Sequence, residues 1–206
     1  MPGDPVRWNH NIHYQTLLVD AVPPTATTAL DVGSGDGMLS RRLRERVPSV
    51  TGIDVDAPMV TLARSHPDAG GITYVHGDFL RHPFPPERFD FIGSVATLHH
   101  MDPAAALQRM RALLRPGGSL AILGLYRQEL PRDLAWAIAG AVTTRVLKRS
   151  SRRTYWETPA PKIWPPAHTL RQIEQVVRHE LPGASFRRLV LWRYLVTWQR
   201  PDVGAR

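Results

Sequence analysis

The sequence predicts an α/β fold built on a parallel β-sheet. Strand patterns and helix patterns alternate over the first 130 residues, as βαβ units do. The chain has 206 residues, of which 43% are hydrophobic, and this size suits one domain with a sizeable core. Three glycines follow the first strand pattern at alternating positions, where a strand of such a sheet passes into a helix.

The individual elements follow from short apolar runs and from their start and stop signals. Pro58 lies in the first turn of a helix pattern, where proline is tolerated. Asp102 is a helix N-cap before Pro103, and Pro116 with Gly117 stops the same helix. We therefore expect strands over 27–32, 49–55, 72–77, 88–96 and 119–126, and helices over 37–47, 57–65 and 103–118.

The last third of the chain has a different composition. Residues 130–149 predict a helix with an apolar middle and a basic end, and 150–168 are rich in proline and tryptophan. Thr169 is a helix cap for 169–180, and 184–200 predict two strands that form a hairpin at the sheet edge. We expect one domain over 1–206, with an N-terminal cap or lid segment over 1–26 and a substrate-side insertion over 127–168.

Composition excludes several classes of protein. The chain has no cysteine, so neither a disulfide framework nor a thiolate metal site is expected. The N-terminus has no apolar core of a secretion signal, and no apolar run approaches the ~20 residues of a membrane span, so a cytoplasmic protein is expected. His10 and His13 have a metal-like spacing but no third ligand beside them, and we expect no metal. The net charge is +8, which suits an anionic small molecule or nucleic acid.

The glycine-rich stretch "LDVGSGDG" (30–37) does not suit a pyrophosphate. A dinucleotide-binding loop has the pattern G-x-G-x-x-G, but Met38 stands at the last position. Asp36 lies inside the turn and Asp31 precedes it, and both would repel an anion. The loop therefore predicts a ligand with a cationic part and sugar hydroxyls.

Two further acids follow the next two strand patterns. Asp54 ends the second strand, where a carboxylate can accept hydrogen bonds from both ribose hydroxyls. Asp78 ends the third strand, and with Phe79 it could bind an adenine. The carboxylate would accept a hydrogen bond from the amine of the base, and the Phe79 ring would stack on the base. Together with Asp31 these acids should lie at the carboxyl edge of the sheet, where open α/β folds bind ligands.

The chain resembles the class I S-adenosylmethionine-dependent methyltransferases, including small bacterial members of unassigned substrate. Five stretches carry the resemblance in order and spacing: "ALDVGSGDG" (29–37), "GIDV" (52–55), "HGDF" (76–79), "FDFIGSVATLHHM" (89–101) and "LRPGGSLAI" (114–122). The resemblance implies a doubly wound, mostly parallel seven-stranded sheet of the Rossmann-like kind, with an antiparallel C-terminal hairpin. It also implies S-adenosyl-L-methionine as methyl donor and S-adenosyl-L-homocysteine as product.

The resemblance assigns a part of the donor to each matching position. The glycine loop would lie along the methionine part, Asp31 would face the amino group, and Asp54 would bind the ribose. Val95 would lie on the sulfonium side, and Tyr14, in the segment that precedes the first strand, would close the site. The implied cofactor-binding residues are Tyr14, Asp31, Gly33, Ser34, Gly35, Gly37, Asp54, Val55, Met59, Asp78, Phe79, Ser94 and Val95.

Catalysis of methyl transfer depends mainly on holding donor and nucleophile in line, at about 3–3.5 Å. A base is needed only where the nucleophile keeps its proton, and His99 is then the candidate. The alternative is that one histidine of this segment only shapes the cofactor pocket. The expected substrate-binding residues are His13, His100, Tyr126, Trp156 and Trp164, although core packing is an alternative for each aromatic residue.

The leading hypothesis is an enzyme that methylates an oxygen, nitrogen or carbon of a small-molecule metabolite. The alternative is an RNA or protein methyltransferase that uses the basic run at 145–153, but nucleic acid is not the expected partner. A binding protein without activity and a dehydrogenase are further alternatives. A monomer or a homodimer is expected.

Overall fold

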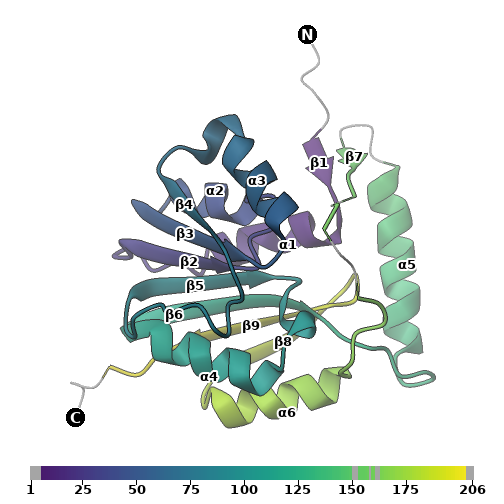
Figure 1. The fold of residues 1–206 in the computed structure, drawn as a ribbon. Coiled ribbons are helices and arrows are strands. Elements are labelled where there is room, and N and C mark those ends of the chain that lie inside the picture. Colours follow the sequence, from purple (N-terminus) through teal and green to yellow (C-terminus); the bar gives the residue numbers. More distant parts are fainter. Residues whose placement is uncertain (1–5, 150–152, 158, 161–162, 203–206) are drawn as a thin grey trace.

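A twisted seven-stranded sheet forms the centre of the molecule (Figure 1). The computed structural model describes residues 6–149, 153–157, 159–160 and 163–202. The strand order is β4-β3-β2-β5-β6-β9-β8, and β9 is antiparallel to both of its neighbours. The expected mostly parallel sheet with an antiparallel C-terminal hairpin is confirmed. Its strands are β2 (Thr28–Val32), β3 (Ser49–Asp54), β4 (Ile72–His76), β5 (Phe89–Val95), β6 (Leu114–Leu125), β8 (Ser185–Leu189) and β9 (Arg193–Gln199).

Helices cover both faces of this sheet (Figure 1). One core lies between the sheet and α4 (Pro103–Leu113) with α6 (Leu170–Glu180), and includes Leu107 and Ile173. A second core lies between the sheet and α1 (His10–Val19) with α2 (Met38–Arg44), and includes Leu18 and Leu43. Leu18, Leu43 and Leu107 are fully buried, and each contributes about 2 kcal/mol through removal from water. The other helices are α3 (Ala57–Ser65), α5 (Leu134–Lys148) and the 3₁₀ turns η1 (Pro67–Ala69) and η2 (Leu98–His100).

The boundary between α4 and β6 differs from the expected one. Asp102 caps α4 as expected, since its carboxylate accepts a hydrogen bond of 2.7 Å from the Ala105 amide. The helix, however, ends at Leu113 and not at 118, and β6 begins at Leu114 and not at 119. Pro116 restricts the residue before it to extended conformations, so the chain leaves the helix earlier.

The N-terminal segment and the insertion pair with each other, which the sequence did not indicate. β1 (Val6–Trp8) and β7 (Arg153–Tyr155) form a two-stranded parallel sheet. Asn9 caps α1 through the amides of Asn11 and Ile12, at 2.9 and 2.8 Å, and donates to the Trp156 carbonyl at 3.2 Å. These contacts place α1 and the insertion side by side, next to the carboxyl ends of the parallel strands.

None of the helices in the described part of the chain is long and apolar enough to cross a membrane.

Candidate functional site

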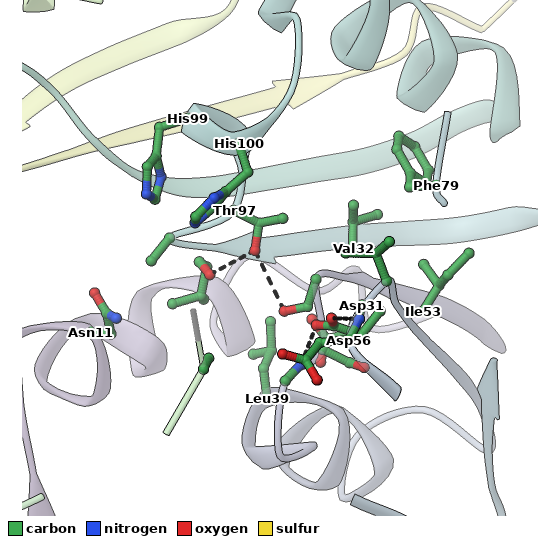
Figure 2. Close-up of a pocket in the computed structure, with 18 of the residues that line it drawn as sticks. Asn11, Asp31, Val32, Leu39, Ile53, Asp56, Phe79, Thr97, His99 and His100 are labelled. Carbon is green, nitrogen blue, oxygen red and sulfur yellow. Dashed lines mark hydrogen bonds between the residues drawn. The ribbon is translucent and has the colours of Figure 1, made fainter. Parts of the chain in front are cut away.

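A cavity of about 760 Å³ opens at the carboxyl ends of the parallel strands. It lies beside the switch point of the sheet, where β2 has β3 on one side and β5 on the other. The loops after β2, β3, β4 and β5 line it, together with α1 and the insertion. Figure 2 shows Asn11 and His99 at one end of this cavity and Phe79 and Ile53 at the other.

The glycine loop has the backbone conformation that only glycine adopts readily. Gly33 has φ of +73°, and a Cβ there would lie 2.0 Å from Thr97 Oγ1. Gly35 has φ of +53° but no atom near its would-be Cβ, so it faces open space. The loop therefore needs Gly33 for close packing and leaves room for a ligand above Gly35.

Asp31 is buried at the end of β2 and lines the cavity. Its Oδ2 accepts a hydrogen bond of 2.6 Å from Ser40 Oγ. Burial is the main reason that the pKa of Asp31 is raised to about 7; the hydrogen bond from Ser40 opposes the rise, and the charges of Asp54 and Asp36 contribute to it. A cationic group bound beside it would stabilise the carboxylate form.

Asp54 joins two loops of the site. Its Oδ2 accepts a hydrogen bond of 2.7 Å from the Gly35 amide, and its Oδ1 accepts one of 2.9 Å from the Asp56 amide. Asp56 in turn caps α3 by accepting from the Met59 amide at 3.3 Å. Each oxygen of Asp54 keeps a free lone pair, so the carboxylate can still accept from two ligand hydroxyls.

Asp78 does not end β4 as expected, because the strand stops at His76 and Asp78 lies in the following loop. Its Oδ1 accepts a hydrogen bond of 2.9 Å from the Leu80 amide, which leaves Oδ2 3.6 Å from Arg81 Nε. Phe79 is 5% exposed and lines the cavity, with the Arg109 guanidinium 5.6 Å from its ring centre. A carboxylate and an aromatic face thus lie at the same end of the cavity.

His99 and His100 lie in η2, and their ring centres are 4.0 Å apart. Burial, together with the neighbouring His100 and Arg193, lowers the pKa of His99 to about 4. His99 is therefore neutral at neutral pH. Its Nδ1 is buried and has no hydrogen-bond partner among the described residues.

His99 and His10 should make the folded protein less stable as the pH falls from about 6.5 to about 4. A histidine in the unfolded chain takes up a proton near pH 6.5, whereas His99 and His10 in the folded chain do so only near pH 4. Between about pH 7 and about pH 5 the two histidines should therefore lower the melting temperature, whereas Asp31, whose pKa burial raises, opposes them. The His99→Asn variant should show a smaller drop. An equal drop in the variant would contradict the lowered pKa of His99.

Most of the predicted site residues line the cavity. Of the predicted donor-binding residues, those at the cavity are Asp31, Gly33, Ser34, Gly35, Asp54, Val55, Asp78, Phe79 and Val95. His99, His100, Trp156 and Trp164 also line it. Six predicted residues lie outside the lining: His13, Tyr14, Gly37, Met59, Ser94 and Tyr126.

The residues outside the lining have structural contacts instead. Tyr126 is 1% exposed, and its hydroxyl accepts a hydrogen bond of 3.0 Å from Arg188 Nε, so it packs in the core and is not a wall of the cavity. Tyr14 donates to the Val190 carbonyl at 3.0 Å, and Ser94 donates to the Val32 carbonyl at 3.0 Å. His13 contacts Tyr14, with ring centres 4.6 Å apart.

Gly37 and Met59 are likewise turned to the protein. A Cβ at Gly37 would lie 2.2 Å from the Tyr74 hydroxyl, and Met59 is 5% exposed in the first turns of α3. These two positions shape the loops that carry the site without facing its interior.

The structure also adds residues that sequence reasoning missed. Arg193 was detectable as a lone arginine inside the apolar run "LVLWRYLV". For α1 the sequence analysis expected Tyr14 and His13 at the site, whereas the helix turns Asn11, Ile12 and Gln15 to the cavity. The missed lining residues include Asn9, Asn11, Ile12, Gln15, Thr97, Ile163 and Arg193.

A Rossmann-like sheet with an acidic crevice at its switch point defines an α/β protein with a site suited to a nucleoside. A family model described as a methyltransferase domain matches residues 30–122. A protein of Mycobacterium tuberculosis (strain H37Rv), named an uncharacterized methyltransferase, is 40% identical over 195 residues, which cover 94% of this chain and 98% of that protein.

Two further matches agree. A demethylmenaquinone methyltransferase of Roseiflexus castenholzii is 30% identical over 161 residues, which cover 74% of this chain and 68% of that protein. The crystal structure of an S-adenosylmethionine-dependent methyltransferase from Aquifex aeolicus has the same fold, with a TM-score of 0.61, 18% identity and coverage of 90% and 88% of the two chains. The chain belongs to the class I S-adenosylmethionine-dependent methyltransferases and is an enzyme.

Proposed function

We propose that the cavity binds S-adenosylmethionine and that the enzyme methylates a small molecule. The observation that carries the proposal is the arrangement of Asp31, Asp54 and Asp78 around one cavity, each at or just beyond the carboxyl end of a different parallel strand. A sulfonium nucleoside has a cationic end, two ribose hydroxyls and an aromatic base, and these carboxylates and Phe79 complement all three. Ser34 Oγ is buried without a hydrogen-bond partner among the described residues, which suits a polar ligand against the loop.

Each residue would have a distinct role. Asp54 would accept hydrogen bonds from the ribose while it fixes the glycine loop through Gly35. Asp31 would lie opposite the amino group, and Phe79 would pack on the base. The bound donor would supply a methyl group on a positively charged sulfur, which makes that carbon open to displacement. The chain would hold the acceptor in line with it and exclude water.

His99 would act on the acceptor. Because its pKa is about 4, the imidazole is neutral at neutral pH and can accept a proton through a free ring nitrogen. The same low pKa makes it a weak base, suited to acceptors that release a proton easily. For an acceptor that is already deprotonated, the same nitrogen would only orient it.

A small acceptor suits the way the cavity is covered. Ile12 of α1 and Trp156 and Trp164 of the insertion line it, and these apolar groups enclose a volume typical of small-molecule sites. Arg145, Lys148 and Arg149 are not among the lining residues, Arg152 lies outside the described residues, and nothing is described of the Arg153 side chain. The basic run therefore gives no support to an RNA acceptor at this site.

Calorimetry with S-adenosylhomocysteine and with NAD tests the donor. We expect heat of binding with the first and none with the second. The transfer itself is tested by incubating the protein with donor labelled on its methyl group and a mixture of small metabolites at low and high salt. Label should appear in a small product at both salt concentrations, whereas an enzyme that binds RNA phosphates would lose activity steeply as the salt concentration rises. Absence of binding to S-adenosylhomocysteine would refute the proposal.

A further inference from the structure

The described lining of the cavity contains one arginine together with several carboxylates. Arg193 is the only lysine or arginine among the described lining residues, and it is 7% exposed. It begins β9 and pairs with Leu125 at the end of β6. In the strand order β2-β5-β6-β9 it is three positions away from the strand that carries Asp31.

The contacts of Arg193 are all neutral. Its Nε donates to Asn11 Oδ1 at 2.9 Å, and Nη1 donates to the carbonyls of Leu191 and Trp192 at 3.2 and 3.3 Å. Its Nη2 donates no hydrogen bond to any described residue, and no described carboxylate lies within ion-pair distance. Burial lowers the pKa of Arg193 only to about 10, so the guanidinium remains charged at neutral pH.

A buried charge without an opposite charge is strongly unfavourable unless a ligand supplies that charge. The backbone of the turn before Arg193 holds the guanidinium in place. Leu191 and Trp192 both have left-handed backbones, with φ of +63° and +57°, although neither is glycine. This strained turn directs two successive carbonyls at Nη1 and thereby fixes the guanidinium.

The residues around Arg193 indicate which kind of anion it could bind. Gln15 lies one helical turn after Asn11, and its buried Oε1 has no partner among the described residues, as is also true of His99 Nδ1. The apolar residues that line the cavity include Ile12, which follows Asn11 in α1, and Trp156, whose carbonyl accepts a hydrogen bond from the α1 cap Asn9. One cation, neutral polar groups and apolar walls suit a single negative charge on an apolar body, not a phosphate dianion.

We propose that Nη2 of Arg193 binds a carboxylate of the methyl acceptor, so the acceptor is an apolar or aromatic monocarboxylic acid. This inference rests on the proposed methyltransferase function and names the substrate class of the same site. The other carboxylate that could meet Arg193 is that of the donor's methionine. The place of Arg193 on β9, away from the glycine loop after β2, favours the acceptor.

The test uses the full-length protein saturated with S-adenosylhomocysteine and compares each carboxylate with its uncharged amide by calorimetry. The probes are benzoate, 2-naphthoate and decanoate. At least one carboxylate should bind tenfold or more tightly than its amide. This comparison needs no variant, so it does not depend on the folding of one. Equal binding of every pair, or no binding of any carboxylate, overturns the inference, whereas loss of S-adenosylhomocysteine binding would overturn the proposed function itself.

The variant Arg193→Gln separates acceptor binding from donor binding. It should reduce the carboxylate preference to less than threefold, whereas Arg187→Gln, which removes an exposed charge from the neighbouring strand β8, should leave it unchanged. Both variants should bind S-adenosylhomocysteine as the native protein does.

Two outcomes would contradict the inference. If Arg193→Gln lowers the affinity for S-adenosylhomocysteine tenfold but leaves the affinity for 5′-methylthioadenosine, which lacks the carboxylate, unchanged, then Arg193 binds the donor and the inference is wrong. Arg193→Met should raise the melting temperature, because it removes a buried uncompensated charge. If Arg193→Met instead lowers the melting temperature and Arg193→Gln keeps the preference for carboxylates, the role of Arg193 is purely structural and the inference is wrong.

Discussion

Replacing Asp54 by alanine should lower the affinity for S-adenosylhomocysteine by about a hundredfold or more. Hydrogen bonds to a charged group contribute about 1.5–3 kcal/mol each, and the variant loses those to two ribose hydroxyls. It also loses the hydrogen bond from the Gly35 amide, so the glycine loop is no longer fixed against β3. Calorimetry with S-adenosylhomocysteine measures the change.

Two comparisons make this expectation specific. Asp68→Asn removes a carboxylate whose side chain is 80% exposed in η1, outside the cavity, and should leave the affinity unchanged. Asp54→Asn keeps the size of the side chain and one carbonyl oxygen, so it should lie between alanine and the native protein. If Asp54→Ala binds within twofold of the native protein, the assignment of this carboxylate to the ribose is wrong.

The order of the elements could be predicted from the sequence because its signals are local. Asp102 with Pro103 marks the start of α4, and Thr169 marks α6, where the structure has a reciprocal cap with Gln172. The end of α4 was placed too late because the apolar pattern continues across Leu113 into β6. The pairing of β1 with β7 joins segments more than a hundred residues apart, and no local pattern encodes it.

The site residues that could be predicted from the sequence depend on local signals, whereas those that could not depend on contacts between distant segments. Asp31 and Asp54 each end or nearly end a parallel strand, so the topology of the sheet places them together. Tyr126 also follows a strand, but its hydroxyl turns to Arg188 of β8, and nothing near Tyr126 in the sequence indicates that partner. Arg193 reaches the cavity because β9 lies beside β6, a neighbour set by the whole sheet.

The variant Asp31→Asn should remove a pH dependence of donor binding. In the free protein the pKa of Asp31 is about 7, so the side chain is partly protonated at neutral pH. A cationic amino group binds the carboxylate form better, so affinity for S-adenosylhomocysteine should rise as the pH increases through about 7 and then level off. The asparagine variant should bind more weakly above pH 7, by tenfold or more, and should show no such rise.

Proton release gives an independent measurement of the same group. Binding near pH 7 should release part of a proton, so the calorimetric enthalpy should depend on the ionisation enthalpy of the buffer, and this dependence should vanish in Asp31→Asn.

In the ligand-free protein, Asp31 changes the stability with pH in the direction opposite to that of the histidines. A carboxyl whose folded pKa is raised loses stability as the pH rises from about 4 through about 7, so Asp31→Asn should melt higher than the native protein at about pH 8. If the buffer dependence persists in the variant, the released proton comes from another group and Asp31 does not face the amino group. If the variant also binds as tightly as the native protein, the burial of Asp31 serves only the packing of β2 against Ser40.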